Sequence, residues 1–232
     1  MTGPHLVLRY GRLVPQPDRA RKTSRRDQYA QATRQAIIDA GRRLFAERGY
    51  FATKVDDIAA EADVAPATVY AVVGGKQGLL AELRSMWTTE PAITTTLKYI
   101  EDNDDAESII RYVAHASRQR REQFGDVMRI LLETAPHDSA VAAELKPATD
   151  LYRLTVAKVA NRISELAALR AEVDVELAAD VLWFYFGYQS YFTLHDDNSW
   201  TYERAERWLA DQACQALLDQ SQQRLGSSAP RS

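Results

Sequence analysis

The side chains best suited to chemistry in this sequence lie between Ala65 and Lys76, and the chemistry they suit is binding of DNA. Ala65, Pro66 and Ala67 are small, so a backbone carrying them can approach a groove closely, and alanine can contact thymine methyl groups. The methyl group of Thr68 can do the same, and its hydroxyl can bond to a base or a phosphate. Since this run has no Arg, Asn or Gln for bidentate base contacts, we expect modest base specificity. DNA shape or an amino-terminal arm would supply the rest.

Two short helices joined by a tight turn are expected to position these side chains. Thr53 suits the start of the first helix, because its hydroxyl can accept a hydrogen bond from a free N–H of the first turn. Asp63 suits the turn, since Asp tolerates left-handed backbone. Pro66 suits the first position of the second helix, and the pair Gly74-Gly75 suits its end. This spacing is typical of a helix-turn-helix, whose second helix enters the major groove, but an ordinary helical hairpin has it too.

The stretch AIIDAGRRLFAERGY precedes the helix pair, and TVYAVVGGKQGLL runs from its second helix into the next. With the residues between them, they resemble the DNA-binding domain of the TetR family of bacterial transcriptional regulators over about fifty residues. The matching positions are Ala36, Ile37, Ala40, Leu44, Phe45, Gly49, Tyr50, Thr53, Ile58, Ala59, Ala62, Val64, Thr68, Tyr70, Lys76, Leu79 and Leu80. Three positions depart from the family pattern. Val73 replaces an aromatic, Asp63 replaces the turn Gly, and Ala65 replaces a capping Ser or Thr, which costs about 1 kcal/mol.

The resemblance implies that Thr53, Tyr70 and Lys76 hold the DNA backbone through hydroxyls, helix-start amides and a lysine charge. The alternatives are that Tyr70 is a core aromatic and that Lys76 is merely solvated. A lysine in the first turn of a helix is electrostatically disfavoured, and an external phosphate would relieve this. We therefore favour the phosphate contact.

A basic run precedes the first helix, in a segment with three prolines and no apolar period that we expect to be irregular over residues 1–26. Such a run is either a solvated tail or an arm that lies on phosphates or enters the minor groove, and a disordered arm can become ordered on DNA. The candidate DNA contacts in this run are Arg21, Lys22, Arg25 and Arg26.

Composition is that of an ordinary globular protein, with 46% hydrophobic and 26% charged residues in a chain of 232. The sequence has neither a run of about twenty apolar residues nor a signal-peptide pattern, and its single cysteine, Cys214, fits a reducing compartment. We therefore expect a cytoplasmic protein with no membrane partner. Residues 1–87 carry 14 Lys and Arg against 9 Asp and Glu, whereas residues 88–232 carry 15 against 23. A basic head on an acidic body is expected when only the head touches phosphate.

Helical periodicity extends along the rest of the chain, and the whole is predicted to be all-α with about nine helices. Helices are expected at about 28–48, from 76 to at least 87, at 106–121, 124–134, 139–168 with a kink near Pro147, 175–194, and after Thr201. The expected domains are a flexible basic arm (1–26), a helix-turn-helix domain (27–75), a helical effector-binding and dimerisation domain (76–220) and a disordered tail (221–232).

The segment 175–194 is apolar on all sides, so it must be buried on all sides, partly by a partner subunit. By the family resemblance, the last two long helices pair across a two-fold axis. The candidate interface residues are Phe184, Tyr188, Tyr191, Trp208, Ala213 and Leu217. An effector pocket between body helices would bind an apolar or aromatic molecule, with His115 or Arg118 as a polar contact. The candidate lining residues are Trp87, Tyr112, His115, Phe124, Met128, Trp183 and Phe186.

No enzyme motif is recognisable. The sequence Gly74-Gly75-Lys76 lacks the first glycine and the final Ser or Thr of a phosphate loop, and the four histidines lack metal-pair spacing, so we expect no metal and no cofactor. The favoured hypothesis is a homodimeric, TetR-like repressor released from double-stranded DNA by a small ligand. Two alternatives stay open. One is an effector-independent activator or architectural DNA binder with a filled body, and the other is a helical ligand-binding or protein-interaction module without operator binding.

Overall fold

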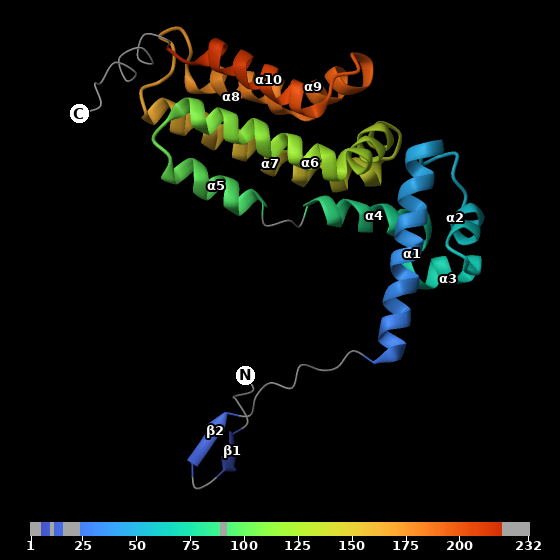
Figure 1. The fold of residues 1–232 in the computed structure, drawn as a ribbon. Coiled ribbons are helices and arrows are strands. Elements are labelled where there is room, and N and C mark those ends of the chain that lie inside the picture. Colours follow the sequence, from blue (N-terminus) through green and yellow to red (C-terminus); the bar gives the residue numbers. More distant parts are fainter. Residues whose placement is uncertain (1–5, 10–11, 16–23, 89–91, 220–232) are drawn as a thin grey trace.

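The computed structural model describes residues 6–9, 12–15, 24–88 and 92–219. Apart from one antiparallel hairpin, the described elements are helices, which confirms the all-α class. The hairpin pairs β1 (Leu6–Arg9) with β2 (Arg12–Pro15), in a segment expected to be irregular. Figure 1 shows it near the amino terminus, well apart from the helices.

The head comprises four helices: α1 (Arg25–Arg48), α2 (Val55–Glu61), α3 (Pro66–Val73) and α4 (Gly75–Thr88). Helix α1 begins three residues earlier than predicted, because Ser24 caps it. The Ser24 hydroxyl accepts from the Asp27 N–H, and the Asp27 carboxylate accepts from the Ser24 N–H, both at 3.1 Å. Helices α2 and α3 lie beside the carboxyl-terminal half of α1, and α4 leads toward the body (Figure 1).

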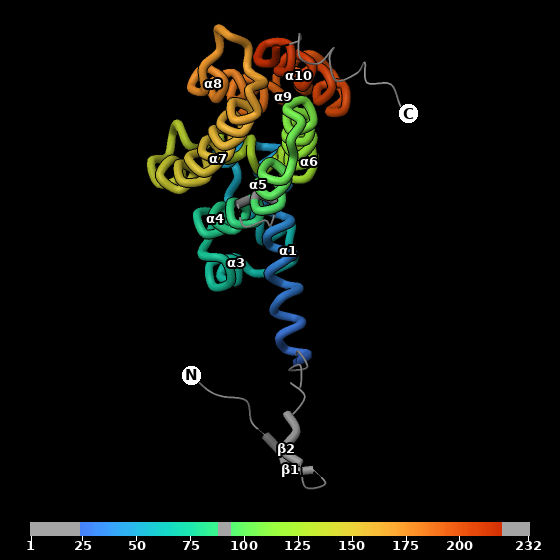
Figure 2. Tube along the Cα trace, turned by 90° about the vertical axis from the view of Figure 1, so that its left-hand side faces the viewer, coloured from blue at the N-terminus to red at the C-terminus, as the bar shows by residue number. Residues whose placement is uncertain are grey.

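The body is a stack of helical layers (Figure 1). Helices α6 (Ala106–Thr134) and α7 (Ser139–Glu165) form the middle layer, joined by a short 3₁₀ turn, Ala135–His137. One side is covered by α8 (Val175–Phe186), α9 (Tyr188–Phe192), a π-helical turn (Thr193–Asp197) and α10 (Tyr202–Leu217). The other side is covered by α5 (Ala92–Asp102), which the periodicity did not predict. The view in Figure 2 shows the head at one end of this stack.

Two predicted helix boundaries are wrong. Helix α6 is continuous where two helices were expected, because Glu122 and Gln123 between them favour helix. The aromatic segment breaks at Gly187, where the backbone is extended. A β-carbon there would lie 2.3 Å from the carbonyl oxygen of Trp183, so only glycine permits this close passage. Pro147 lies inside α7 without dividing it.

Buried apolar side chains of the described residues form two clusters. The first cluster begins in the head with residues such as Ile37, Leu79 and Trp87, and continues into the body with Phe124 and Met128. The second cluster lies within the body, between α5, α6, α7, α8 and α10. The hydrophobic core of the head is therefore continuous with part of the body, across the domain boundary expected at residue 75.

A partly buried ion pair adds to this contact. The Arg42 guanidinium of α1 donates two hydrogen bonds to the Asp126 carboxylate of α6, with N–O distances of 2.5 and 2.7 Å. It also donates to the Gln123 carbonyl at 2.8 Å. Burial alone would raise the pKa of the Asp126 carboxyl, but the hydrogen bond and charge of Arg42 outweigh it, so that pKa lies below its ordinary value. Arg84 of α4 pairs with Glu144 of α7 at 3.0 Å.

Replacing Asp126 should lower stability in a pH-dependent way. A carboxyl whose pKa is lowered by folding stabilises the fold above its unfolded pKa, about 3.9, and this contribution is lost as the pH falls through the folded pKa. We expect Asp126→Asn to lower the free energy of unfolding at pH 7 by about 1 kcal/mol, a value reduced by solvent screening. Urea titrations between about pH 7 and pH 2.5 measure this, and the difference should shrink below about pH 4.

The matched control is Asp150→Asn, which breaks the exposed Lys146–Asp150 pair of α7. Exposed i,i+4 pairs contribute only about 0.3–0.5 kcal/mol, so the control should change little. A loss in Asp126→Asn that stays the same down to the lowest pH would contradict the assignment.

Candidate DNA-binding face and ligand pocket

The helix-turn-helix forms where the sequence predicts it. Asp63 adopts the left-handed backbone of the turn, with φ of 53°, and the N–H of Val64 donates to the Ala59 carbonyl at 2.9 Å. Helix α3 starts at Pro66 after an Ala65 that provides no side-chain cap, and it ends at Gly74, which has φ of 77°. The predicted turn, start and end of the second helix are confirmed.

The outer face of α3 presents the small residues singled out in the sequence. Ala65, Pro66 and Ala67 are exposed, and Thr68 is half-buried. Tyr70 is 60% exposed, so it is not a core aromatic. The inner face of α3 packs Val69 and Val73 into the head. The side chains of the predicted reading face are thus available to a groove.

The prediction that the Thr53 hydroxyl caps the first helix of the pair is wrong. The side chain is 1% exposed, and its hydroxyl donates to the carbonyl oxygens of Gly49 at 2.9 Å and Leu44 at 3.2 Å. Helix α2 begins two residues later, at Val55, where the Asp57 carboxylate accepts from the Lys54 N–H at 3.0 Å. The buried Thr53 hydroxyl therefore links the end of α1 to the following turn.

Lys76 lies in the first turn of α4, half-buried, with its ammonium 4.4 Å from the centre of the Tyr50 ring. Burial lowers the pKa of this ammonium. A β-carbon at Gly78 would lie 1.7 Å from the Val73 carbonyl oxygen, so the first turn of α4 touches the end of α3. Lys76 is thereby fixed in position relative to the reading face.

The basic run before α1 is only partly described. Arg25 and Arg26 are exposed in the first turn of α1, so the last two residues of the expected arm are helical. Arg21 and Lys22 lie outside the described residues.

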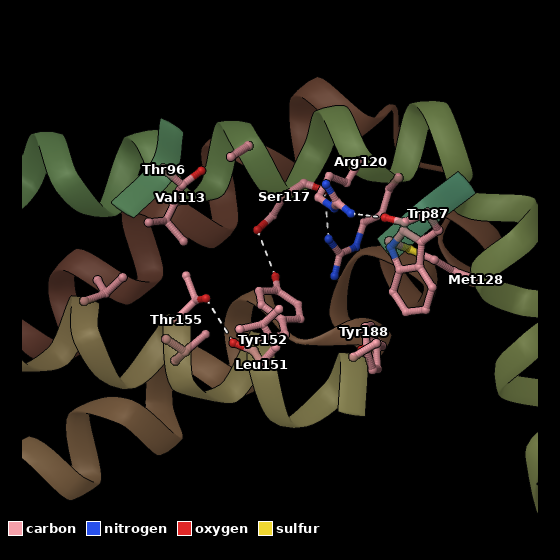
Figure 3. Close-up of a pocket in the computed structure, with 15 residues that line it drawn as sticks. Trp87, Thr96, Val113, Ser117, Arg120, Met128, Leu151, Tyr152, Thr155 and Tyr188 are labelled. Carbon is pink, nitrogen blue, oxygen red and sulfur yellow. Dashed lines mark hydrogen bonds between the residues drawn. The ribbon is translucent and has the colours of Figure 1, made fainter. Parts of the chain in front are cut away.

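The body contains an apolar pocket of about 90 Å³ between α6 and α7. Figure 3 shows Val113 and Ser117 of α6 facing Leu151, Tyr152 and Thr155 of α7 across it. Trp87, from the end of α4, and Tyr188, from α9, lie together at one end (Figure 3). The remaining lining residues are Thr96, Ala116, Arg120, Arg121, Met128, Ala148, Val156 and Val159.

Of the predicted lining residues, the structure places only Trp87 and Met128 at this pocket. The others lie elsewhere because helix packing turns them away. Tyr112 stacks on Tyr99 with ring centres 3.8 Å apart, and His115 and Arg118 face Glu206 of α10. Phe124 and Phe186 are core residues, and Trp183 lies behind Tyr152 in an edge-to-face contact.

The polar groups that do reach the pocket were not predicted. The Ser117 and Tyr152 hydroxyls lie 3.1 Å apart, and the Tyr152 hydroxyl donates to the Phe186 carbonyl at 2.5 Å. Arg121 lines the same pocket and is 2% exposed. One signal could have identified it: Arg121 lies eight residues after Val113 and four after Ser117, which places it on the buried stripe of its helix.

Two of the six predicted interface residues are exposed. Phe184 is 71% exposed on α8 and Trp208 is 42% exposed on α10, and both line one surface groove. The remaining four lie inside the core of the chain itself and are not surface residues: Tyr188, Tyr191, Ala213 and Leu217. They were misplaced because the chain's own α6 and α7 cover the side assigned to a partner.

The single cysteine is a buried side chain. Burial raises the pKa of the Cys214 thiol to about 12, so it stays protonated. Within the described ranges, no cluster of three or more His, Cys, Asp and Glu residues is placed to hold a metal ion. None of the helices in that part of the chain combines the length and apolarity needed to cross a bilayer.

Comparison with known proteins agrees with this geometry. Residues 37–83 match the family model described as bacterial regulatory proteins, tetR family. The chain is 25% identical over 154 residues to YdeS of Bacillus subtilis (strain 168), an uncharacterised HTH-type transcriptional regulator, covering 66% of this chain and 75% of YdeS.

Two solved structures share the fold. The TetR-family regulator PfmR from Thermus thermophilus is 20% identical, with a TM-score of 0.62 over 84% of this chain and 96% of its own. The regulator FadR from Bacillus subtilis, in complex with stearoyl-CoA, is 16% identical, with a TM-score of 0.62 over 78% and 98%. Residues 37–83, which contain the helix-turn-helix, therefore match the tetR family of bacterial regulatory proteins, and the helical fold of the chain is similar to that of these two regulators.

Proposed function

We propose that this protein is a homodimeric repressor whose affinity for its operator falls when a small molecule fills the pocket between α6 and α7. One observation carries the proposal. Trp87, Met128 and Tyr188 line the pocket and also belong to the apolar cluster that forms the core of the head. An occupant that moves these side chains therefore acts on the packing of the head. The alternative of an effector-independent regulator predicts a filled body without a pocket, and this cavity argues against it.

DNA contact is assigned to the exposed face of α3 and its neighbours. Ala65, Ala67 and Thr68 enter the major groove, while Tyr70 and Lys76 lie against phosphates. The half-buried ammonium of Lys76 supports the last assignment, since a desolvated cation at a helix start gains from an external anion. Arg25 and Arg26 extend the positive surface along α1, and Arg21 and Lys22 belong to the same proposed arm.

Coupling runs along α4, which carries Lys76 in its first turn and Trp87 in its last. The carbonyl of Trp87 accepts a hydrogen bond from Arg120 of α6 (Figure 3). A ligand that prefers a displaced Trp87 shifts the population toward a head position unsuited to DNA. FadR, which shares this fold, was solved in complex with stearoyl-CoA, and this supports a small-molecule ligand for the present protein.

Dimerisation is assigned to the exposed faces of α8 and α10. Phe184 and Trp208 present large apolar surfaces there, and Leu177 is also exposed on α8. Such a strip is self-complementary across a two-fold axis, which would place two heads on successive major-groove faces of one operator. We retain residues 27–75 as the DNA-binding domain and 76–220 as the effector-binding and dimerisation domain, and we place the protein in the cytoplasm with its DNA.

Removal of the Lys76 charge tests operator binding. We expect Lys76→Ala to weaken binding to fragments flanking the protein's own gene by about tenfold and to reduce the salt slope by about one, because one phosphate contact is lost. The measurement is fluorescence anisotropy at several salt concentrations. Lys98→Ala, on α5 and paired with Asp102, is the matched control and should bind as wild type does. Equal affinity and slope in Lys76→Ala would remove the phosphate assignment.

Replacement of Phe184 tests the dimer. We expect Phe184→Glu to convert the dimer to monomer in sedimentation velocity, because a buried unpaired charge costs several kcal/mol at an apolar interface. Tyr29→Glu changes a similarly exposed aromatic on α1 and should leave the dimer intact. A Phe184→Glu protein that stays dimeric would show that the subunits meet on another face.

A further inference from the structure

Arg121 carries a buried positive charge with no carboxylate partner among the described residues. Its guanidinium donates to the carbonyls of Ser117 at 2.8 Å, Phe186 at 3.0 Å and Gly187 at 2.6 Å, and it lies 4.6 Å from the Tyr191 ring centre. Its Nε has no hydrogen-bond partner. Among the described residues, it is the one buried side-chain nitrogen or oxygen that lacks such a partner. The side chain lines the pocket.

Other arginines of α6 are paired differently. Arg111 contacts Glu107 and Asp211, Arg118 contacts Glu122 and Glu206, and Arg129 contacts Asp196. These three side chains are more exposed than Arg121, so they need an anion less. The most deeply buried of these guanidinium groups is thus the one without a counterion in the part of the chain that the structure describes.

The protein itself compensates only part of this charge. The Phe186 and Gly187 carbonyls are the carboxyl end of α8, which acts as roughly half a negative charge. A buried ion that is incompletely paired is unfavourable, and an unsatisfied donor adds to the cost. An anion that binds in the pocket beside Arg121 would offset the unpaired charge.

The pocket wall is suited to an apolar molecule with one anionic group. None of the described residues that line it is acidic. The Ser117 and Tyr152 hydroxyls, 3.1 Å apart, line the pocket together with Arg121, while Val113 and Leu151 provide apolar surface. We propose that the effector of this protein is an amphiphilic monoanion, with a carboxylate as its natural head group, whose anionic group binds Arg121 and whose apolar body lies between α6 and α7. This inference rests on the pocket being the effector site of the proposed function.

A matched series of eight-carbon probes tests the charge. Octanoate, octan-1-ol and octylamine have the same apolar body and differ in the head group. We expect isothermal titration calorimetry on the full-length protein to give octanoate at least about tenfold tighter binding than either other probe. Equal or tighter binding of the alcohol or the amine, or no binding of any of the three, would overturn the proposal.

Variants locate the site. Arg121→Met should abolish the preference for octanoate over octanol, while Arg118→Met, three residues earlier on α6 and paired with Glu206, should keep it. Because Arg121 also holds the end of α8, Arg121→Met could unfold. Thr155→Phe therefore serves as a second variant, since it fills the pocket from the half-buried face of α7 and should abolish octanoate binding. Octanoate binding that survives in Thr155→Phe, or a preference that survives in folded Arg121→Met, would contradict the proposal.

Failure of this inference and failure of the proposed function give different results. Octanoate that binds at Arg121 without changing DNA affinity would support the anion site and remove the ligand-released repressor. Octanol that binds as tightly as octanoate and releases DNA would remove the anion site and leave the repressor standing.

Discussion

Burial of Trp87 against α6 and α9 is the contact on which the rest of the structure depends. Its ring lies 5.7 Å from that of Tyr188, and its carbonyl is bound by Arg120. The same side chain belongs to the core of the head and to the wall of the pocket. A well-packed core cannot deform by small amounts without cost, and the proposed coupling between pocket occupancy and the head rests on these shared contacts. The head and the pocket therefore share one set of apolar contacts.

Helix α6 holds three other helices through side chains that lie close together along it. Asp126 binds α1, Arg120 binds the end of α4, and Arg121 binds the end of α8. Three neighbouring elements are therefore attached to one rigid helix within two turns. The pocket opens along the same stretch of α6, beside Ser117. The pocket is lined by Arg120 and Arg121, the side chains of α6 that hold the ends of α4 and α8.

The features that depend on local backbone preferences were predicted correctly from the sequence, whereas those that depend on packing between distant helices were missed. Asp63, Pro66 and Gly74 define the helix-turn-helix through backbone preferences that act within a few residues, and the structure has them as expected. The predicted helix cap at Thr53 was wrong, because the Thr53 hydroxyl donates to carbonyls at the end of the preceding helix. The body was harder to predict. Which faces of the aromatic segment are covered depends on helices distant in the sequence, and on the break at Gly187. Helical spacing alone does not carry that information.

The most direct measurement is the affinity for the operator of a variant in which a larger side chain fills the pocket. Ala148→Phe places a ring in the pocket, whereas Ala143→Phe adds the same ring to an exposed position five residues earlier on α7. At fixed salt, we expect Ala148→Phe to bind the operator fragment about tenfold more weakly than wild type, and Ala143→Phe to bind it equally well. A folded Ala148→Phe dimer that excludes octanoate yet binds DNA with wild-type affinity would show that pocket and head are not coupled.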